Sequence, residues 1–454
     1  MGLTSEIGKF VASTRCEDIP ENAAAIVCRG FTDCVGLLIG GLAEPVTAIV
    51  AKSVGWTAPL ARIADFGPAG IAAPDLALIY GTAAHALDYD DTALTGHPSA
   101  VLVSAILAEA QEVGASGKDM VAAYVVGYEV WADLLRREAD ALHQKGWHPS
   151  AMYGALAAAS ASAHLRGLNA ELATRAVAIA ASLASGVVAN FGTMTKPFHI
   201  GRTAQSGLTA TRLAQAGLTA SADAIEHDLG FLQAISPRGT VDTRAPARFG
   251  DPWQILRHGI NIKLYPVCLG THRILDAMIE VCRTNAIKAD DIRAVDVEIA
   301  ENSTKILRNH RPRTGLEAKF SAEFAIAAAA VAGRCSGEEL SDTFVRRADV
   351  QNLLEKVRIH PLTEKDPEEP TFSPFDRVRV TLTDGRVIAS EPVAHARGHF
   401  KRGVEREVLW RKFADCAAGA IGHERARALF AALQDLPRAG GVGDLRASLA
   451  PAAE

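Results

Sequence analysis

Hydrophobic residues recur at intervals of three and four positions through about the first 270 residues, which is the spacing of one buried face on an α-helix. Glycine and proline interrupt the pattern and mark where one helix ends and the next begins. The pattern predicts helices at residues 23–42, 74–91, 98–113, 119–140, 149–165, 170–189 and 203–216.

The pattern changes after about residue 285. Residues 292–300 (IRAVDVEIA) alternate apolar and polar side chains, which predicts a strand, and residues 357–360 predict a second. Residues 375–393 place alternating runs on both sides of Asp384-Gly385, which predicts a hairpin because Asp-Gly favours a tight turn. Helices are expected at residues 322–332, 405–418 and 424–434.

The predicted fold is therefore mainly α-helical. A large all-helical domain is expected at residues 1–268 and 404–454, with a smaller α+β domain at residues 269–403. The C-terminal helices are expected to pack back onto the first domain, and the charged, proline-rich residues 363–374 are expected to form a surface loop.

Composition narrows the choice of partners and compartment. The 454 residues are rich in alanine and only 6% aromatic, and the net charge of −5 argues against binding to nucleic acid. The seven cysteines contain no C-x-x-C pair, so no zinc ribbon or iron–sulfur cluster is expected, and a reducing cytoplasm fits them. No signal peptide is expected, and the weakly polar residues 176–191 are too short to span a membrane and predict a buried core helix.

The common cofactor and nucleophile motifs are missing from the sequence. No G-x-G-x-x-G lies between a strand and a helix, and neither G-x-S-x-G nor H-E-x-x-H occurs. Residues 114–118 (GASGK) look like part of a phosphate-binding loop, but Glu112 stands where its first glycine should be and Asp119 follows the lysine.

The segment AHALDYDDT, residues 84–92, carries the first candidate chemistry. On a helix that runs to residue 91, Asp88 and Thr92 would share one face, with Asp91 beside them. Aspartates are unfavourable at this end of a helix because its dipole prefers cations there. The cluster therefore indicates a functional role, with an ordinary solvated helix end as the alternative.

A His-Pro-Ser-Ala sequence occurs twice, beginning at His97 and at His148, each time before an apolar helix. Proline favours the first turn of a helix, so each histidine is expected at or just outside an N-cap. The positive end of the helix dipole disfavours a protonated imidazole there. A neutral histidine in that position can exchange protons near pH 7, although a purely structural helix start is the alternative.

Two basic segments supply candidate groups for binding an anion. KPFHIGR contains Lys196 and Arg202 at the expected entrance to a helix, where an ordinary exposed basic loop is the alternative. IKLYPVCLGTH lies at the expected domain junction and contains a lysine among apolar neighbours, which needs an anionic partner if it is buried. Its candidate residues are Lys263, Tyr265, Cys268 and His272. Cys268 and His272 could pair as nucleophile and base, whereas a buried cysteine without catalytic function is the commoner case.

Taken together, these segments resemble the MmgE/PrpD family, in order and over nearly the whole chain. The resemblance is carried by AHALDYDDT, GHPSAVL, GWHPSAMYGALAAAS, KPFHIGRTAQSG, IKLYPVCLGTH and AKFSAEFAIAAAAVAG. It implies a large helical domain with a smaller α+β lid domain, a homodimer, and no metal or other cofactor. The family includes 2-methylcitrate dehydratase, cis-aconitate decarboxylase and iminodisuccinate epimerase.

The resemblance also implies which residues form the active site. Its positions fall on Asp88, Thr92, His97, His148, Lys196 and Lys263. The dehydratase branch usually continues its first His-Pro as HPSDN and lacks the second, whereas this chain has HPSAV and keeps both. The decarboxylase branch has a histidine where Cys268 stands here.

The expected function is that of a lyase acting on a small di- or tricarboxylate, in the manner of a dehydratase, with epimerase and decarboxylase as alternatives. One of His97 and His148 would be the base and the other the acid, Asp88 would orient or balance a lysine or histidine, and Thr92 would donate or accept a hydrogen bond. The lysines, Arg202 and the helix N-termini would hold the anion. Two other readings remain, a fumarase- or aspartase-like lyase and a helical binding protein without catalysis.

Overall fold

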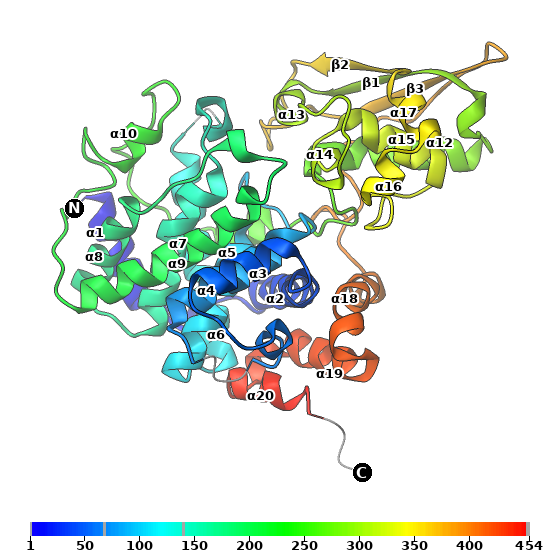
Figure 1. The fold of residues 1–454 in the computed structure, drawn as a ribbon. Coiled ribbons are helices and arrows are strands. Elements are labelled where there is room, and N and C mark those ends of the chain that lie inside the picture. Colours follow the sequence, from blue (N-terminus) through cyan, green and yellow to red (C-terminus); the bar gives the residue numbers. More distant parts are fainter. Residues whose placement is uncertain (1, 67–69, 139–140, 451–454) are drawn as a thin grey trace. The chain divides into compact units, whose positions relative to one another are not determined.

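Two units make up the chain in the computed structural model, which describes residues 2–66, 70–138 and 141–450 (Figure 1). The helical unit comprises Met1–Asn190, Met194–Asn261 and Glu405–Glu454, and the sheet unit comprises Phe191–Thr193 and Ile262–Val404. The sequence pattern places the boundary between the two domains after residue 268, whereas the structure places it after Asn261. The pattern gives no sign that residues 191–193 join the sheet unit. As predicted, the fold is mainly α-helical with one small sheet.

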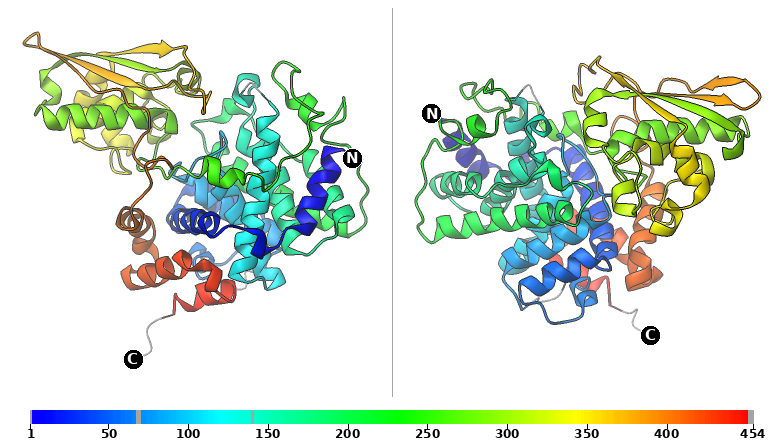
Figure 2. Two further views of the ribbon diagram at one scale, coloured as in Figure 1. Left: turned by 180° about the vertical axis from the view of Figure 1, so that it is seen from behind. Right: turned by 45° about the horizontal axis from the view of Figure 1, so that its top comes forward.

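The helical unit is built from helices alone, joined by loops and short 3₁₀ turns (Figure 2). In the first 261 residues these helices are α1 (Leu3–Ser13), α2 (Glu21–Gly41), α3 (Pro45–Ser53), α4 (Ala73–Ala86), α5 (Pro98–Val113), α6 (Gly117–Arg136), α7 (Pro149–Leu165), α8 (Ala170–Ala181), α9 (Thr195–Gln215), α10 (Phe231–Ile235) and α11 (Gln254–His258). The C-terminal segment adds α18 (Arg406–Ile421), α19 (His423–Gln434) and α20 (Val442–Ala447).

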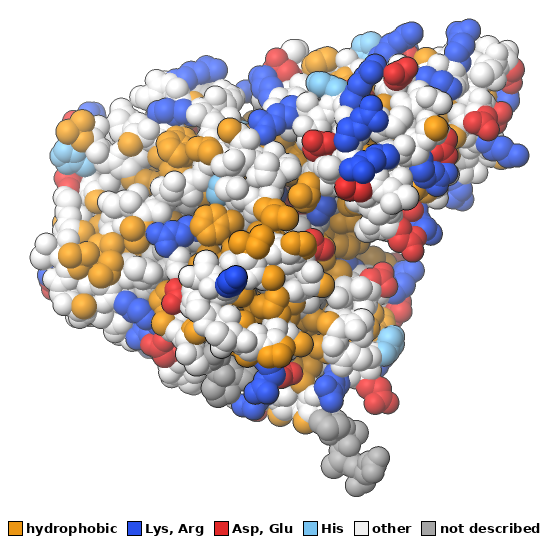
Figure 3. Space-filling model, in the orientation of Figure 1, with side chains coloured by type: hydrophobic (Ala, Val, Ile, Leu, Met, Phe, Trp, Pro, Cys, Tyr) orange, Lys and Arg blue, Asp and Glu red, His pale blue; other side chains and the backbone are white. Residues whose placement is uncertain are grey.

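The C-terminal helices belong to the helical unit. Gln434 of α19 donates a hydrogen bond from Nε2 to the hydroxyl oxygen of Thr32 in α2, at 2.7 Å. By length and composition alone α2 could cross a membrane, but 72% of its most apolar stretch is buried inside the structure, as in a core helix. On the face shown in Figure 3, hydrophobic side chains gather over the helical unit, and lysine and arginine side chains crowd the sheet unit.

The sheet unit contains one four-stranded sheet in the order β2-β1-β3-β4. Its strands are β1 (Ile292–Ala300), β2 (Val357–Leu362), β3 (Arg377–Leu382) and β4 (Val387–Ala389), and its helices are α12 (His272–Thr284), α13 (Glu301–Ile306), α14 (Gly315–Ala318), α15 (Ala322–Ala332), α16 (Asp342–Val345) and α17 (Ala348–Leu354). Strand β1 pairs parallel with β2 and antiparallel with β3, and β3 and β4 form the predicted hairpin. Val295 and Val380, which pair in register, are both buried in the core that this sheet shares with α12 and α15.

Several predicted elements match the structure residue for residue, because each has a clear start signal. Helices α5 and α7 begin at Pro98 and Pro149, with His97 and His148 as their N-caps. Proline suits this position because its missing N–H would have no partner within the helix and its φ is already helical. Ser321 starts α15 by accepting a hydrogen bond from the backbone N–H of Phe324.

The predicted helix at residues 74–91 is wrong in its last turn, because α4 ends at Ala86. Leu87 caps it and Asp88 adopts a left-handed conformation with φ of 51°. The periodicity predicts that Asp88 and Thr92 share a helix face, and this prediction is wrong because neither residue lies in the helix. Breaking the helix takes the aspartates out of its carbonyl end, where their charges would be unfavourable.

Three other boundaries differ from the prediction by four residues or more. Helix α9 begins at Thr195 rather than residue 203, so Lys196 lies inside its first turn rather than before it. Helix α8 ends at Ala181 rather than residue 189, so residues 176–191 are not one buried helix; the serines and glycine that follow compete poorly for helix. Helix α6 ends at Arg136, and the predicted end at Asp140 lies outside the described residues.

Helix α9 approaches its neighbours through glycines. A Cβ added to Gly81 of α4 would lie 2.8 Å from the Cα of Gly201 in α9, and one added to Gly207 would lie 2.6 Å from the backbone nitrogen of Ala159 in α7. Both distances are shorter than real Cβ atoms tolerate. Because α4 carries His85 and α9 carries Lys196, this close contact sets the distance between those two side chains.

We expect Gly201→Ala to destabilise the protein by about 2 kcal/mol or more, because the new methyl group would collide with the carbonyl of Leu78 and push α4 and α9 apart. Urea unfolding measures the loss. Gly419→Ala is the matched control, since Gly419 lies on exposed α18 with open space around it and should gain roughly 0.5–1 kcal/mol. Equal stability of the two variants would contradict the packing account.

Candidate active site

Four histidines, a lysine and two aspartates gather where helices of the helical unit begin and end. We call this group the histidine cluster, and its members are His85, Asp88, Asp90, His97, His148, Lys196 and His199. His85 lies in the last turn of α4, His97 and His148 cap α5 and α7, and Lys196 and His199 lie in the first two turns of α9. All seven side chains are buried.

The ring-to-ring distances show how tightly the histidines gather. Ring centroids are 4.4 Å apart for His85 and His97, 6.4 Å for His97 and His148, and 5.5 Å for His148 and His199. His148 and His199 also meet through their Nδ1 atoms, 3.3 Å apart, so one ring donates and the other accepts. Two of the histidines, His97 and His148, cap helix N-termini, where the dipole disfavours a second positive charge.

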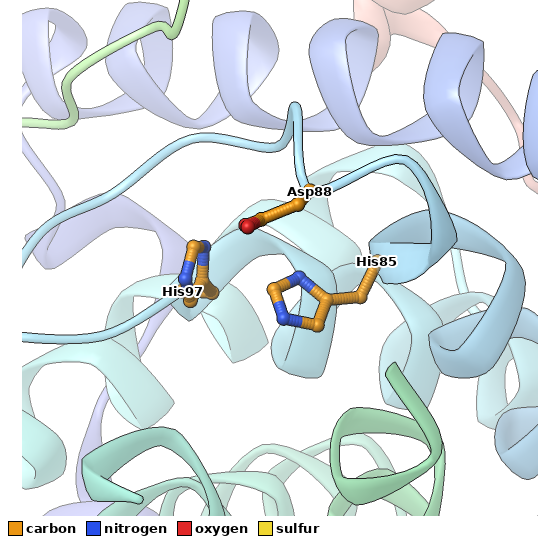
Figure 4. A group of neighbouring side chains, drawn as sticks. All are labelled: His85, Asp88 and His97. Atoms are coloured by element: carbon orange, nitrogen blue, oxygen red, sulfur yellow. The ribbon is translucent and has the colours of Figure 1, made fainter. Parts of the chain in front are cut away.

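Lys196 supplies the positive charge of the cluster. Its Nζ lies 2.7 Å from Nε2 of His85 and 3.0 Å from Oδ1 of Asp88. Figure 4 shows the Asp88 side chain directed between the rings of His85 and His97. A buried ammonium is stable only with such partners, since desolvation of an isolated charge costs several kcal/mol.

Asp90 bridges two of the histidines. Its Oδ1 lies 2.8 Å from Nδ1 of His85, and its Oδ2 lies 3.0 Å from Nδ1 of His97. Nδ1 of His97 also lies 3.1 Å from the backbone carbonyl oxygen of Asp91. Burial works to raise the pKa of Asp90, but its interactions with His85 and His97 outweigh burial and hold that pKa well below its usual range.

Three histidines of the cluster, His85, His148 and His199, are held neutral by burial. Burial lowers the pKa of His85 to about 3 although Asp90 opposes the shift, and burial lowers the pKa of His199 to about 4. Burial also lowers the pKa of His148 well below its ordinary value, with Lys196 adding to the effect. A neutral imidazole has one lone pair and one N–H, so each ring can accept or donate a proton.

A second buried network lies behind the loop that carries Asp88 and Asp90. Lys412 of α18 reaches the carboxylate of Asp33 at 2.6 Å and donates to the backbone carbonyl of Tyr89 at 2.7 Å. Ser99 donates to Oδ2 of Asp91 at 2.6 Å. Burial, then the nearby carboxylates, raise the pKa of Asp91 well above its usual value, whereas that of its neighbour Asp90 is lowered, so Asp91 takes up a proton more readily than Asp90.

The donor chemistry of the cluster does not favour a metal ion. His85, Asp88 and His97 bring possible ligand atoms within 4.8 Å of one another. However, Nε2 of His85 and Oδ1 of Asp88 already face the ammonium of Lys196, and Nδ1 of both rings faces the Asp90 carboxylate. A divalent ion there would lie against a fixed positive charge.

The sheet unit holds a second group of this kind, in Glu369, His395 and His399. Nδ1 of His399 accepts a hydrogen bond from the backbone N–H of Lys401 at 3.2 Å, so the ring proton lies on Nε2, which faces Glu369. That nitrogen therefore has no lone pair for a metal ion.

The structure brings together four of the sequence-predicted residues, namely Asp88, His97, His148 and Lys196. Thr92 is buried nearby in the helical unit, and its backbone pairs with Asn261. Arg202 differs from the expectation, because it is exposed on α9 and its guanidinium donates to Gln205 at 2.6 Å.

The other four predicted residues belong to the sheet unit. Lys263 is buried, and the Tyr265 hydroxyl donates to Asp276 at 2.6 Å. The Cys268 backbone N–H donates to the backbone carbonyl oxygen of Lys319 at 2.9 Å. Nε2 of His272 lies 3.3 Å from the carbonyl oxygen of Val267. The roles of these four residues stay predictions.

Three cluster residues, His85, Asp90 and His199, do not emerge as candidates from the sequence pattern. His85 and Asp90 lie within AHALDYDDT, and His199 lies three residues after Lys196, so all three stand in segments with other candidates. The spacing of His199 from Lys196 would place both on one helix face, provided that α9 is predicted to begin at Thr195. No signal in the sequence links Lys412 to this site.

Comparison with known proteins places this geometry in a family. Residues 5–244 match the family model of the MmgE/PrpD N-terminal domain, and residues 265–436 match that of the MmgE/PrpD C-terminal domain. The chain belongs to the MmgE/PrpD family. This confirms the resemblance predicted from the sequence.

Relatives of this MmgE/PrpD protein include three that are named cis-aconitate decarboxylase. That of Mus musculus is 27% identical over 372 residues, covering 79% of this chain and 75% of the relative, and that of Homo sapiens is 27% identical over 79% of this chain and 76% of the relative. That of Aspergillus terreus is 26% identical over 94% of this chain and 91% of the relative. The protein is therefore an enzyme of the lyase class, as predicted.

Acid should destabilise this MmgE/PrpD protein through its neutral histidines. The folded pKa of His199, about 4, lies below the roughly 6.5 of an unfolded histidine, so the unfolded chain binds more protons between those values. The free energy of unfolding should therefore fall as pH drops from about 6.5 toward 4. Urea unfolding across that range gives the slope of the free energy of unfolding against pH. In His199→Asn this slope should be smaller by the amount that about one proton contributes.

His227→Asn, at an exposed histidine, is the control and should leave the slope unchanged. The account of a neutral, buried His199 fails if His199→Asn follows the same pH profile as the unsubstituted protein.

Proposed function

We propose that this protein cleaves a bond next to a carboxylate group in a small di- or tricarboxylate, with decarboxylation of cis-aconitate as the first reaction to test. The observation that carries the proposal is one buried ammonium, that of Lys196, together with two buried histidines, His97 and His148, at the N-termini of α5 and α7. The names of its relatives support cis-aconitate as the starting substrate.

The reaction class follows from where charge develops. When a bond to the carbon next to a carboxylate breaks, an electron pair spreads onto the carboxylate oxygens, and fixed positive groups stabilise it. Lys196 and the backbone N–H groups at the starts of α5 and α7 supply such positive groups. Asp88 balances the charge of Lys196 and holds its ammonium in place.

Proton transfer falls to His97 and His148. In a decarboxylation, the bond between the carboxylate and its neighbouring carbon breaks and carbon dioxide leaves. The electron pair stays on that neighbouring carbon of the substrate, which must then receive a proton. A bound polyanion favours protonation of the nearby imidazoles, so one of them can deliver this proton. The second histidine then orients the substrate or returns a proton from water.

Dehydration is the second candidate, because the lowered pKa of His148 keeps its resting imidazole neutral. A neutral imidazole is ready to abstract a proton from carbon, and a second imidazole can protonate the departing hydroxyl group. Epimerisation needs the same first step. The neutrality of His148 and His199 supports these reactions as well as decarboxylation.

The remaining expectations extend the proposal but do not carry it. They are the substrate-binding roles of Thr92, Arg202, Tyr265, Cys268 and His272, the catalytic role of Lys263, the homodimer, the cytoplasmic location and activity without metal or cofactor. None of them is needed for the test of reaction class that follows.

A panel of small di- and tricarboxylates, followed by proton NMR in deuterated water, should reveal the reaction. We expect cis-aconitate to lose carbon dioxide and gain one deuteron in the product. Loss of water from a hydroxy-acid would instead identify a hydro-lyase, and deuterium exchange without loss of either would identify an epimerase. Absence of any change across the panel would contradict the proposed class.

We expect His148→Asn to lower kcat by about 100-fold or more, since general acid–base catalysis typically contributes that much. His164→Asn is the matched control, because His164 lies in the last turn of the same helix and bonds the carbonyl of Val11. It should keep kcat within about threefold of the unsubstituted enzyme. Near-normal turnover by a folded His148→Asn variant would remove His148 from the mechanism.

A further inference from the structure

We propose that Asp90 is a positioning residue that holds His85 and His97 in the same tautomer, with the proton on Nδ1. This fixes Nε2 of His97 as its proton-transfer atom and Nε2 of His85 as the acceptor for Lys196. The proposal rests on the proposed function for its catalytic consequence, whereas the tautomers themselves can be observed without a substrate.

The geometry around each Nδ1 atom allows one assignment. Nδ1 of His97 faces two acceptors, the Asp90 carboxylate and the Asp91 carbonyl, so it must carry the proton. Nδ1 of His85 faces the other oxygen of the same carboxylate. Nε2 of His85 faces the ammonium of Lys196, which can only donate, so that nitrogen holds the lone pair.

One chain of polar contacts therefore runs from Lys196 through hydrogen bonds to His85 and Asp90, and its last step is the ion-pair contact of 3.0 Å between Asp90 and His97. In this chain His85 cannot serve as the base, because its lone pair is engaged by the lysine. His85 instead links Asp90 to the Lys196 ammonium, since its Nδ1 contacts the carboxylate and its Nε2 contacts the ammonium. Asp88 contacts that ammonium directly, so the two carboxylates have different tasks.

Asp90 is suited to this task because it is rigid and charged. Its side chain is fully buried, and each of its oxygens has a histidine partner. The adjacent Asp91 is equally buried, but its carboxyl takes a hydrogen bond from Ser99 and its pKa is raised. Asp90 therefore supplies the carboxylate that faces both rings.

Asp90→Asn separates this role from a general need for a buried polar group. An amide offers one acceptor oxygen and one donor nitrogen, so it can keep only one ring in the Nδ1–H tautomer. The amide oxygen then stays with His85, whose Nε2 keeps its lone pair for Lys196, so the amide N–H faces Nδ1 of His97 and the proton of that ring moves to Nε2. We expect kcat to fall by about 100-fold or more while KM changes less than about threefold, since substrate binding is retained.

Two-dimensional proton–nitrogen NMR of histidine-labelled protein reads the tautomers directly. The unsubstituted protein should show two histidines, assigned to His85 and His97 by single substitution, with the proton on Nδ1. Asp90→Asn should convert one of them. Asp91→Asn is the control, because its carboxyl faces Ser99 rather than a histidine and its backbone carbonyl is kept, so the tautomers should not change and kcat should stay within about fivefold of normal.

Each outcome decides the proposal. An unsubstituted protein with Nε2–H on either ring overturns it, even if no Asp90 variant folds. An Asp90→Asn variant that keeps both tautomers, or that loses no more activity than Asp91→Asn, also overturns it. If the tautomer changes as expected but no carboxylate is turned over by any variant, the positioning role stands and the proposed function fails.

Discussion

The burial of one ammonium group is the constraint on which the candidate site depends. Lys196 lies in the first turn of α9 with little access to water, so its charge must be met by protein groups. Asp88 meets it with a carboxylate, and His85 meets it with a lone pair. The lone pair is available only while His85 is neutral and its proton lies on Nδ1, which is the arrangement that Asp90 supports.

The helices bring these groups together through backbone geometry rather than through a dedicated binding loop. Helices α5, α7 and α9 all begin at the cluster, so their positive ends point to one place. The contact between Gly81 and Gly201 lets α4 and α9 approach closely enough for His85 to reach Lys196. Burial keeps His85, His148 and His199 neutral, and the positive helix ends would attract the carboxylates of a substrate.

The sequence predicts those parts of the fold that have local signals. Proline fixes the starts of α5 and α7, alternation defines β1, and Asp384-Gly385 turns the hairpin between β3 and β4. The end of α4 and the start of α9 are predicted wrongly. The apolar periodicity continues past Ala86, where α4 ends, and it places the start of α9 at residue 203 rather than at Thr195.

The candidate site is predicted in part for the same reason. His97, His148, Lys196 and Asp88 stand out by motif, and they do converge. Asp90 cannot be separated from Asp88 and Asp91 by spacing, since only the break after Ala86 decides which carboxylate faces the rings. Lys412 reaches Tyr89 from 323 positions away, a relation that local sequence cannot contain.

Neutron diffraction from a deuterium-exchanged crystal of the unsubstituted protein tests this account most directly, because it locates the protons of the cluster. We expect deuterium on Nδ1 of both His85 and His97, none on the Asp90 carboxylate, and three deuterons on Nζ of Lys196. Deuterium on Nε2 of His85, or on Asp90, would show that the buried ammonium is not held in the way described and would contradict the account.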